Sequence, residues 1–144
     1  MLALFIGFVA VSLLGTLHCF GLMAIRQVTP LADVTSHTGI VRIFISLLTL
    51  HVAEILLFAA LYAGLQHVQM LGMLASDIPR TWTDYVYFSG INFVTLGYTQ
   101  IETQGSIRMI AMMQSLGGFM VLTWSATFVY SVWGRIWSSD GDQG

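Results

Sequence analysis

Residues 81–100 read TWTDYVYFSGINFVTLGYTQ, and this stretch decides how the rest of the chain is interpreted. The part at 81–94 is apolar and aromatic, but it is too short for a bilayer core of about 30 Å, which needs roughly 20 helical residues. Thr81 followed by Asp84 marks the start of a helix. The polar hexapeptide 95–100 then precedes another apolar segment. Non-helical backbone at membrane depth is tolerated only where it is buried in protein or lines a water-filled cavity. The spacing therefore leaves two interpretations: a re-entrant pore loop, or a surface helix followed by an ordinary turn.

The composition places the chain among membrane proteins. Of its 144 residues, 56% are hydrophobic and only 8% are charged, whereas soluble domains carry about 25% charged residues. The net charge of −2 comes without any acidic or basic run, so there is no electrostatic footprint for nucleic acid. Cys19 is the single cysteine, which excludes an internal disulfide framework and a multi-cysteine metal site. No enzymatic motif is present, and we expect a protein that is not an enzyme.

Three apolar segments are long enough to span a bilayer. We expect an additional N-terminal transmembrane helix at 1–27, which lacks the basic start of a signal peptide. The main module occupies 38–137, with spans at 40–65 and 106–136, and a tail follows at 138–144.

Arginines suggest the orientation of these spans. Arg26, Arg42 and Arg135 fall on one side of the predicted membrane, and Arg80 and Arg108 fall on the other. The positive-inside rule then places the N-terminus outside and the C-terminus in the cytoplasm. We expect a multi-pass protein of the plasma membrane.

The module resembles the pore of two-transmembrane potassium channels. The resemblance covers about residues 81–132 and rests on YFSGINFVTLGYTQ, followed by SIRMIAMMQSLGGFMVLTWSATFVYS. That family has an aromatic pore helix, a TVGYGD filter and a glycine-hinged inner helix. The resemblance implies an all-α integral membrane fold with three transmembrane helices, a re-entrant pore helix at 81–94 and a filter loop at 95–100. It also implies a homotetramer, with 40–65 as outer helix and 106–136 as inner helix.

The resemblance assigns roles to the filter residues. Potassium filters replace the hydration shell of the ion with rings of backbone carbonyls from four chains. Thr95 would form the innermost ring, and Leu96, Gly97 and Tyr98 would present carbonyls to K⁺ or Na⁺. Gly97 permits the backbone conformation that turns carbonyls toward one axis. Three pore-helix residues would support the filter: Tyr87, Phe88 and Asn92.

The outer end of this filter departs from the family pattern. Thr99 stands where a second glycine is expected, and a β-branched residue resists positive φ. Gln100 stands where an aspartate usually ties the filter to the pore helix. Because the inner half is kept and an outer ring is altered, we expect a cation channel with weak or altered potassium selectivity.

A glycine pair lies within the inner helix. By resemblance, Gly117 and Gly118 form a gating hinge, and glycine pairs do mark helix kinks. The alternative is close helix packing by small residues. Gln114 is difficult to place in lipid, and its position favours a cavity or an interface.

Ionisable residues also occur inside the spans. His51 and Glu54 share one face of a helix because they are three residues apart. His18 is eight residues from Arg26 and His51 nine from Arg42, so the two histidines should lie at about the same depth. The three side chains could form a proton relay, a metal site or a pH sensor, or they could simply hold helices together.

The leading hypothesis is therefore a homotetrameric pore-loop cation channel that requires no cofactor beyond its transported K⁺ or Na⁺. Its partners would be lipid, further copies of the chain and an unidentified regulatory protein, with no nucleic acid. Two alternatives stay open: a membrane metal- or haem-binding protein using His18, His51 and Glu54, and a non-conducting channel-like subunit.

Overall fold

The computed structural model describes residues 1–29, 37–75, 81–97 and 101–141. Four α-helices and two short strands make up most of this part of the chain. The elements are α1 (Leu2–Val28), α3 (His37–Leu65), the 3₁₀ turn η1 (Gln69–Leu71), β1 (Met73–Ala75), α4 (Trp82–Phe93), β2 (Glu102–Gln104) and α5 (Ile107–Gly141).

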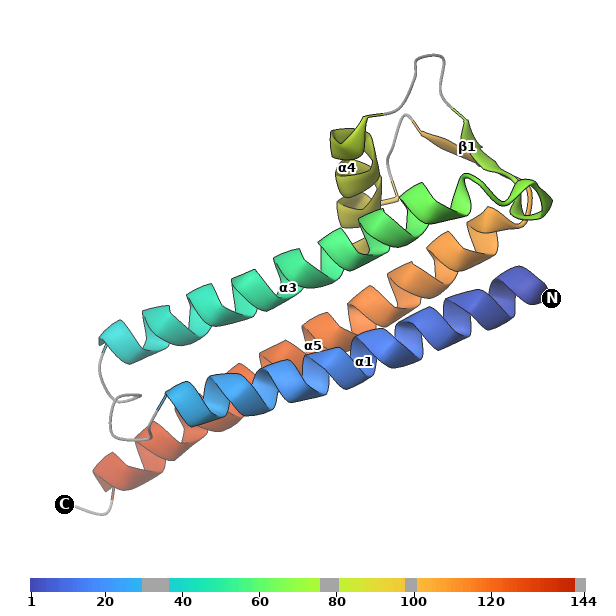
Figure 1. The fold of residues 1–144 in the computed structure, drawn as a ribbon. Coiled ribbons are helices and arrows are strands. Elements are labelled where there is room, and N and C mark those ends of the chain that lie inside the picture. The colour runs from blue at the N-terminus through green and yellow to red at the C-terminus, as the bar shows by residue number, and fades with distance from the viewer. Residues whose placement is uncertain (30–36, 76–80, 98–100, 142–144) are drawn as a thin grey trace.

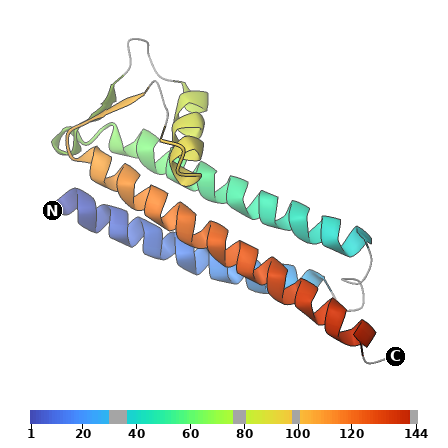
Figure 2. The same ribbon diagram turned by 180° about the vertical axis from the view of Figure 1, so that it is seen from behind.

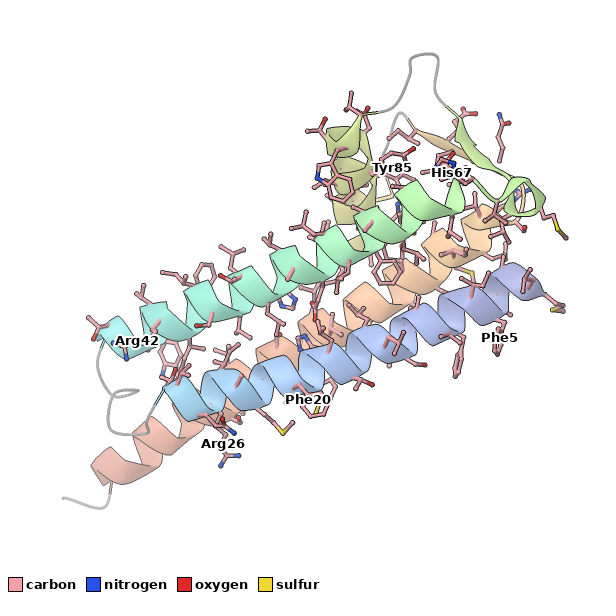
Figure 3. All side chains as sticks on the ribbon, viewed as in Figure 1. Phe5, Phe20, Arg26, Arg42, His67 and Tyr85 are labelled. Atoms are coloured by element: carbon pink, nitrogen blue, oxygen red, sulfur yellow. The ribbon has the colours of Figure 1, made fainter. Side chains whose placement is uncertain are left out.

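Three of these helices are long and apolar enough to cross a membrane, namely α1, α3 and α5. They run side by side as an elongated bundle (Figures 1 and 2), in which α1 packs mainly along α5. Figure 3 shows Phe5 and Phe20 of α1 pointing away from the other helices. Large apolar side chains on the outside are expected where the surroundings are lipid, because the tails are as apolar as the side chains. The chain is thus a multi-pass membrane protein of the all-α class.

The ends of the bundle differ in character. Arg26 and Arg42 lie at the end opposite to α4, whereas His67 and Tyr85 lie at the end that carries α4 and the strands (Figure 3). The two arginines that flank the connection between α1 and α3, which we predicted to lie on the cytoplasmic side, therefore lie at the same end of the molecule. At that same end α5 continues to Gly141, into the segment 138–144 that we expected to be a tail.

The short helix α4 is fixed at its start by a capping box. The Thr81 side chain accepts a hydrogen bond from the backbone N–H of Asp84. In return, the Asp84 carboxylate accepts a hydrogen bond of 2.7 Å from the Thr81 N–H. This reciprocal pair satisfies two of the N–H groups that a helix start leaves without partners. The helix packs on α3 and α5, and it buries Phe88 and Phe93 in the main core. Its length of 12 residues is too short for a span.

A small β-ribbon, which the sequence did not predict, joins the two segments that flank α4. β1 and β2 are antiparallel, with Met73 opposite Gln104 and Ala75 opposite Glu102. Gly72 has a φ of 86°, and a Cβ there would overlap the Gln104 carbonyl oxygen, so glycine is required at this close approach. The ribbon ties the end of the 3₁₀ turn to the start of α5.

Candidate functional site

The C-terminal end of α4 has the hydrogen bonds of a Schellman motif. The Leu96 N–H donates to Ile91 O at 3.0 Å, and the Thr95 N–H donates to Asn92 O at 3.0 Å. In this motif the residue after the C-cap adopts a left-handed conformation and is usually glycine. Here that residue is Thr95, with a φ of 60°. A left-handed conformation costs an L-residue about 1–2 kcal/mol, so the chain is strained where the predicted filter begins.

The described part of the predicted filter consists of Thr95, Leu96 and Gly97. Gly97 has a φ of 66°, so its backbone is left-handed like that of Thr95. All three residues are exposed in the single chain, and the Leu96 side chain is 68% exposed. The remaining predicted filter residues, Tyr98, Thr99 and Gln100, lie outside the described residues.

The three predicted support residues of α4 lie in different surroundings. Phe88 is buried, with 1% of its surface exposed, whereas Tyr87 is 53% exposed. The Asn92 amide donates to Phe88 O at 2.8 Å and so bonds within its own helix. Of these three residues, only Phe88 is therefore buried in the core of the single chain.

A buried polar network joins α4 to α3 and α5. The Gln114 amide donates to the Ser89 hydroxyl at 2.8 Å and to Ser89 O at 3.1 Å. Tyr62 donates to Gln114 Oε1 at 2.7 Å, and Ser89 donates to Ile55 O at 2.8 Å. Gln114, Ser89 and Tyr62 are all fully buried. Gln114 thus lies at an interface between helices, one of the two locations that its position favoured.

Sequence reasoning assigned no role to Tyr62 or Ser89. The sequence did offer one signal for them: a glutamine within an apolar helix needs hydrogen-bonding partners, and polar side chains on neighbouring helices could supply these. That pairing depends on which helix faces meet, and periodicity within one helix does not specify it.

The two predicted hinge glycines are sites of close packing. A Cβ on Gly118 would overlap the carbonyl oxygen of Phe93, and a Cβ on Gly117 would lie 2.7 Å from Val11 Cγ1. The inner helix α5 thereby contacts α4 through Gly118 and α1 through Gly117. This arrangement is the close-packing role that we weighed against a hinge, and the hinge itself stays a prediction.

The structure brings His18, His51 and Glu54 together. Glu54 Oε1 lies 2.8 Å from His18 Nδ1, and Oε2 lies 2.9 Å from His51 Nδ1. The two imidazoles are stacked, with centroids 5.4 Å apart and planes inclined by 17°. His18 and Glu54 are fully buried, and the His51 side chain is 14% exposed. One carboxylate therefore joins α1 to α3.

Ser125 of α5 completes this group, and sequence reasoning missed it. Its hydroxyl lies 3.3 Å from His18 Nε2 and 3.1 Å from His51 Nε2. Two aromatic rings flank the imidazoles: Trp124 lies near His18, and Phe93 lies 5.7 Å from His51. Since Phe93 ends α4, the polar group lies directly beside the end of the pore helix.

A short helix that enters a bundle of membrane spans and ends in a strained, exposed turn defines a pore-loop architecture. In agreement, the sequence profile of a family described as "Ion channel" matches residues 50–134, more than half of the chain. The chain belongs to this ion-channel family, whose members have the two-transmembrane pore-loop module. α1 precedes that module as an additional span.

One curated relative is an uncharacterized membrane protein, YdjJ, of Bacillus subtilis. It is 31% identical over 58 residues, which are 40% of this chain and 17% of that protein. The chain thus spans about a sixth of the length of this relative. No solved structure matches the chain.

Proposed function

We propose that the chain forms a homotetrameric cation channel that conducts K⁺ and Na⁺ with weak or altered potassium selectivity. The observation that carries the proposal is the strained turn at the end of α4. Thr95 and Gly97 there have φ angles of 60° and 66°. Strained backbone that surrounding structure holds in place is typical of functional sites.

Four copies are needed because each chain supplies one quarter of every carbonyl ring. Thr95, Leu96, Gly97 and Tyr98 would present the coordinating oxygens. In the single chain Leu96 is 68% exposed, which suits a segment that further copies cover. A molecular mass by native mass spectrometry that corresponds to four chains supports the proposal, and a monomer in a lipid-like environment contradicts it.

Altered selectivity follows from the outer filter residues. Thr99 and Gln100 replace the glycine and aspartate of the family pattern, a change that would alter one ring of carbonyls. Fewer equivalent sites in series would discriminate less well between K⁺ and Na⁺. We further propose a location in the plasma membrane with the N-terminus outside, supported by the shared location of Arg26 and Arg42 at one end of the bundle.

The substitution that tests the filter assignment is Thr99→Gly combined with Gln100→Asp. Liposomes that contain only the double variant should take up K⁺ and Na⁺ with a higher K⁺-to-Na⁺ flux ratio than liposomes that contain only the wild type. Thr49→Ser is the matched control, because Thr49 is exposed on α3 and bonds to Ile45 O of its own helix. An unchanged preference in the double variant contradicts the assignment, and absence of flux from the wild type indicates a non-conducting subunit.

A further inference from the structure

Four side chains form a closed ring of contacts inside the bundle. Glu54 contacts the Nδ1 atoms of His18 and His51, and Ser125 contacts the Nε2 atoms of the same two histidines. All four imidazole nitrogens are therefore engaged. The ring connects α1, α3 and α5, because each of these helices supplies at least one member.

Ser125 differs from several exposed hydroxyls on the same three helices. Ser12, Thr49 and Thr123 each donate to a carbonyl of the preceding turn in their own helix. The hydrogen bonds of Ser125 instead lead to the two imidazoles. Its single hydrogen is thus available to one ring contact, while its oxygen can accept in the other.

The number of hydrogens in the ring follows from its four contacts. Each hydrogen bond needs one hydrogen between its two heavy atoms, so four contacts need four hydrogens. Ser125 supplies one, each neutral histidine supplies one, and an ionised Glu54 supplies none. That state has three hydrogens, which leaves one contact without a hydrogen and a buried charge of −1.

One additional proton resolves both defects. With one imidazolium, the ring has four hydrogens for four contacts, and the charges of Glu54 and the imidazolium cancel. With two imidazolium ions, both Nε2–H groups point at the Ser125 oxygen, and the buried group has a charge of +1. An uncompensated buried charge is strongly unfavourable. The state with one additional proton is therefore the one that satisfies the ring.

In the part of the chain that the structure describes, this ring forms two ion pairs, which join Glu54 to the two histidines. Among the described residues, the ring contacts Trp124 of α5 and Phe93 of α4. Neither side chain carries a charge. Glu54, His18 and His51 are thus the titratable groups that face one another here.

We propose that Glu54, His18, His51 and Ser125 form a proton-binding site that holds one proton beyond two neutral histidines and a carboxylate. The proton comes from water and makes one of the two imidazoles an imidazolium, which is paired with the ionised Glu54 carboxylate. Its presence completes the link between α1, α3 and α5 beside the end of the pore helix. Its loss removes one hydrogen bond of that link and leaves a buried negative charge, which weakens the attachment of α1.

A metal ion is the competing occupant of these residues. Their ligand atoms lie within 4.8 Å of one another, and two histidines with a glutamate form a known zinc ligand set. The imidazoles, however, are stacked nearly in parallel, and each of their nitrogens already faces a hydrogen-bonding oxygen. The point on which the two Nε2 atoms converge is occupied by the Ser125 hydroxyl, and the Glu54 carboxylate contacts the two Nδ1 atoms, so a metal ion would have to displace one of these partners.

Nitrogen-15 solid-state NMR of the full chain in liposomes tests the proposal, because protonated and bare imidazole nitrogens have distinct shifts. The other two histidines are replaced with His37→Gln and His67→Gln, so that only His18 and His51 contribute. At neutral pH we expect three protonated nitrogens and one bare nitrogen. Two of each, or four protonated nitrogens, would overturn the proposal. One zinc or iron per chain in the purified protein would also overturn it.

Glu54→Gln provides a second, independent measurement. A glutamine amide both donates and accepts, so it supplies the missing hydrogen and completes the ring with two neutral histidines. We expect two protonated and two bare nitrogens in this variant. The control Thr123→Val lies on α5 outside the ring and should keep three protonated nitrogens. Three protonated nitrogens in the Glu54→Gln variant contradict the proposal, and neither measurement depends on whether the channel conducts.

Discussion

The α-carbon of Gly118 packs directly against the main-chain carbonyl of Phe93, with no side chain between the inner helix and the end of the pore helix. This contact is specific, because a Cβ at Gly118 would overlap the carbonyl oxygen. Thr95, the first predicted filter residue, lies two positions beyond Phe93. We therefore expect a displacement of α5 toward Phe93 at Gly118 to move the start of the predicted filter.

Gly118→Ala should destabilise the protein and reduce cation flux. Inserting a methyl group into a well-packed site costs about 1–3 kcal/mol, and here the obstacle is backbone rather than a flexible side chain. Thermal unfolding in detergent and flux from liposomes measure the two effects. Gly15→Ala is the matched control, since a Cβ there meets nothing within 4 Å, and alanine is favoured over glycine in a helix. Equal stability and flux in the two variants would contradict the packing account.

Thr95→Gly should make the protein more stable than Thr95→Ala by about 1 kcal/mol. Both variants lose the threonine hydroxyl, but only glycine adopts the left-handed conformation at this position without steric cost. Comparing the unfolding temperatures of the two variants isolates the backbone effect. A Thr95→Ala variant as stable as Thr95→Gly would show that this residue is not left-handed in the assembled protein.

Gln114→Leu should lower the free energy of unfolding by about 1–3 kcal/mol, because it leaves the buried hydroxyl of Tyr62 and the polar groups of Ser89 without their partner. Adding Tyr62→Phe should recover part of this loss, since the second substitution removes one of the unpaired groups. The double-mutant cycle is measured by thermal unfolding. Additive losses in the double variant would mean that the two side chains do not interact.

Much of the fold could be predicted from the sequence, because lipid imposes simple length rules. Hydrophobic length identified the three spans, and the short segment at 81–94 indicated a helix that does not cross. Helical rise also placed His18 and His51 at one depth, and their rings are stacked 5.4 Å apart.

Features that depend on contacts between distant segments could not be predicted in this way. Ser125 is 107 residues from His18, and nothing in its own helical pattern reveals which face meets the imidazoles. The left-handed Thr95 was missed because β-branched residues resist that conformation. The β-ribbon was missed because strands of three residues show no usable alternation.

Single-channel recording in planar bilayers, with a K⁺-rich, Na⁺-poor solution on one side and the reverse mixture on the other, tests the central claim most directly. The chain should pass discrete cation currents. Because the outer filter residues Thr99 and Gln100 depart from the pattern of selective channels, the reversal potential should lie between zero and the potassium equilibrium potential. A reversal potential at the potassium equilibrium value would contradict the altered filter, and an absence of channel currents would contradict the pore itself.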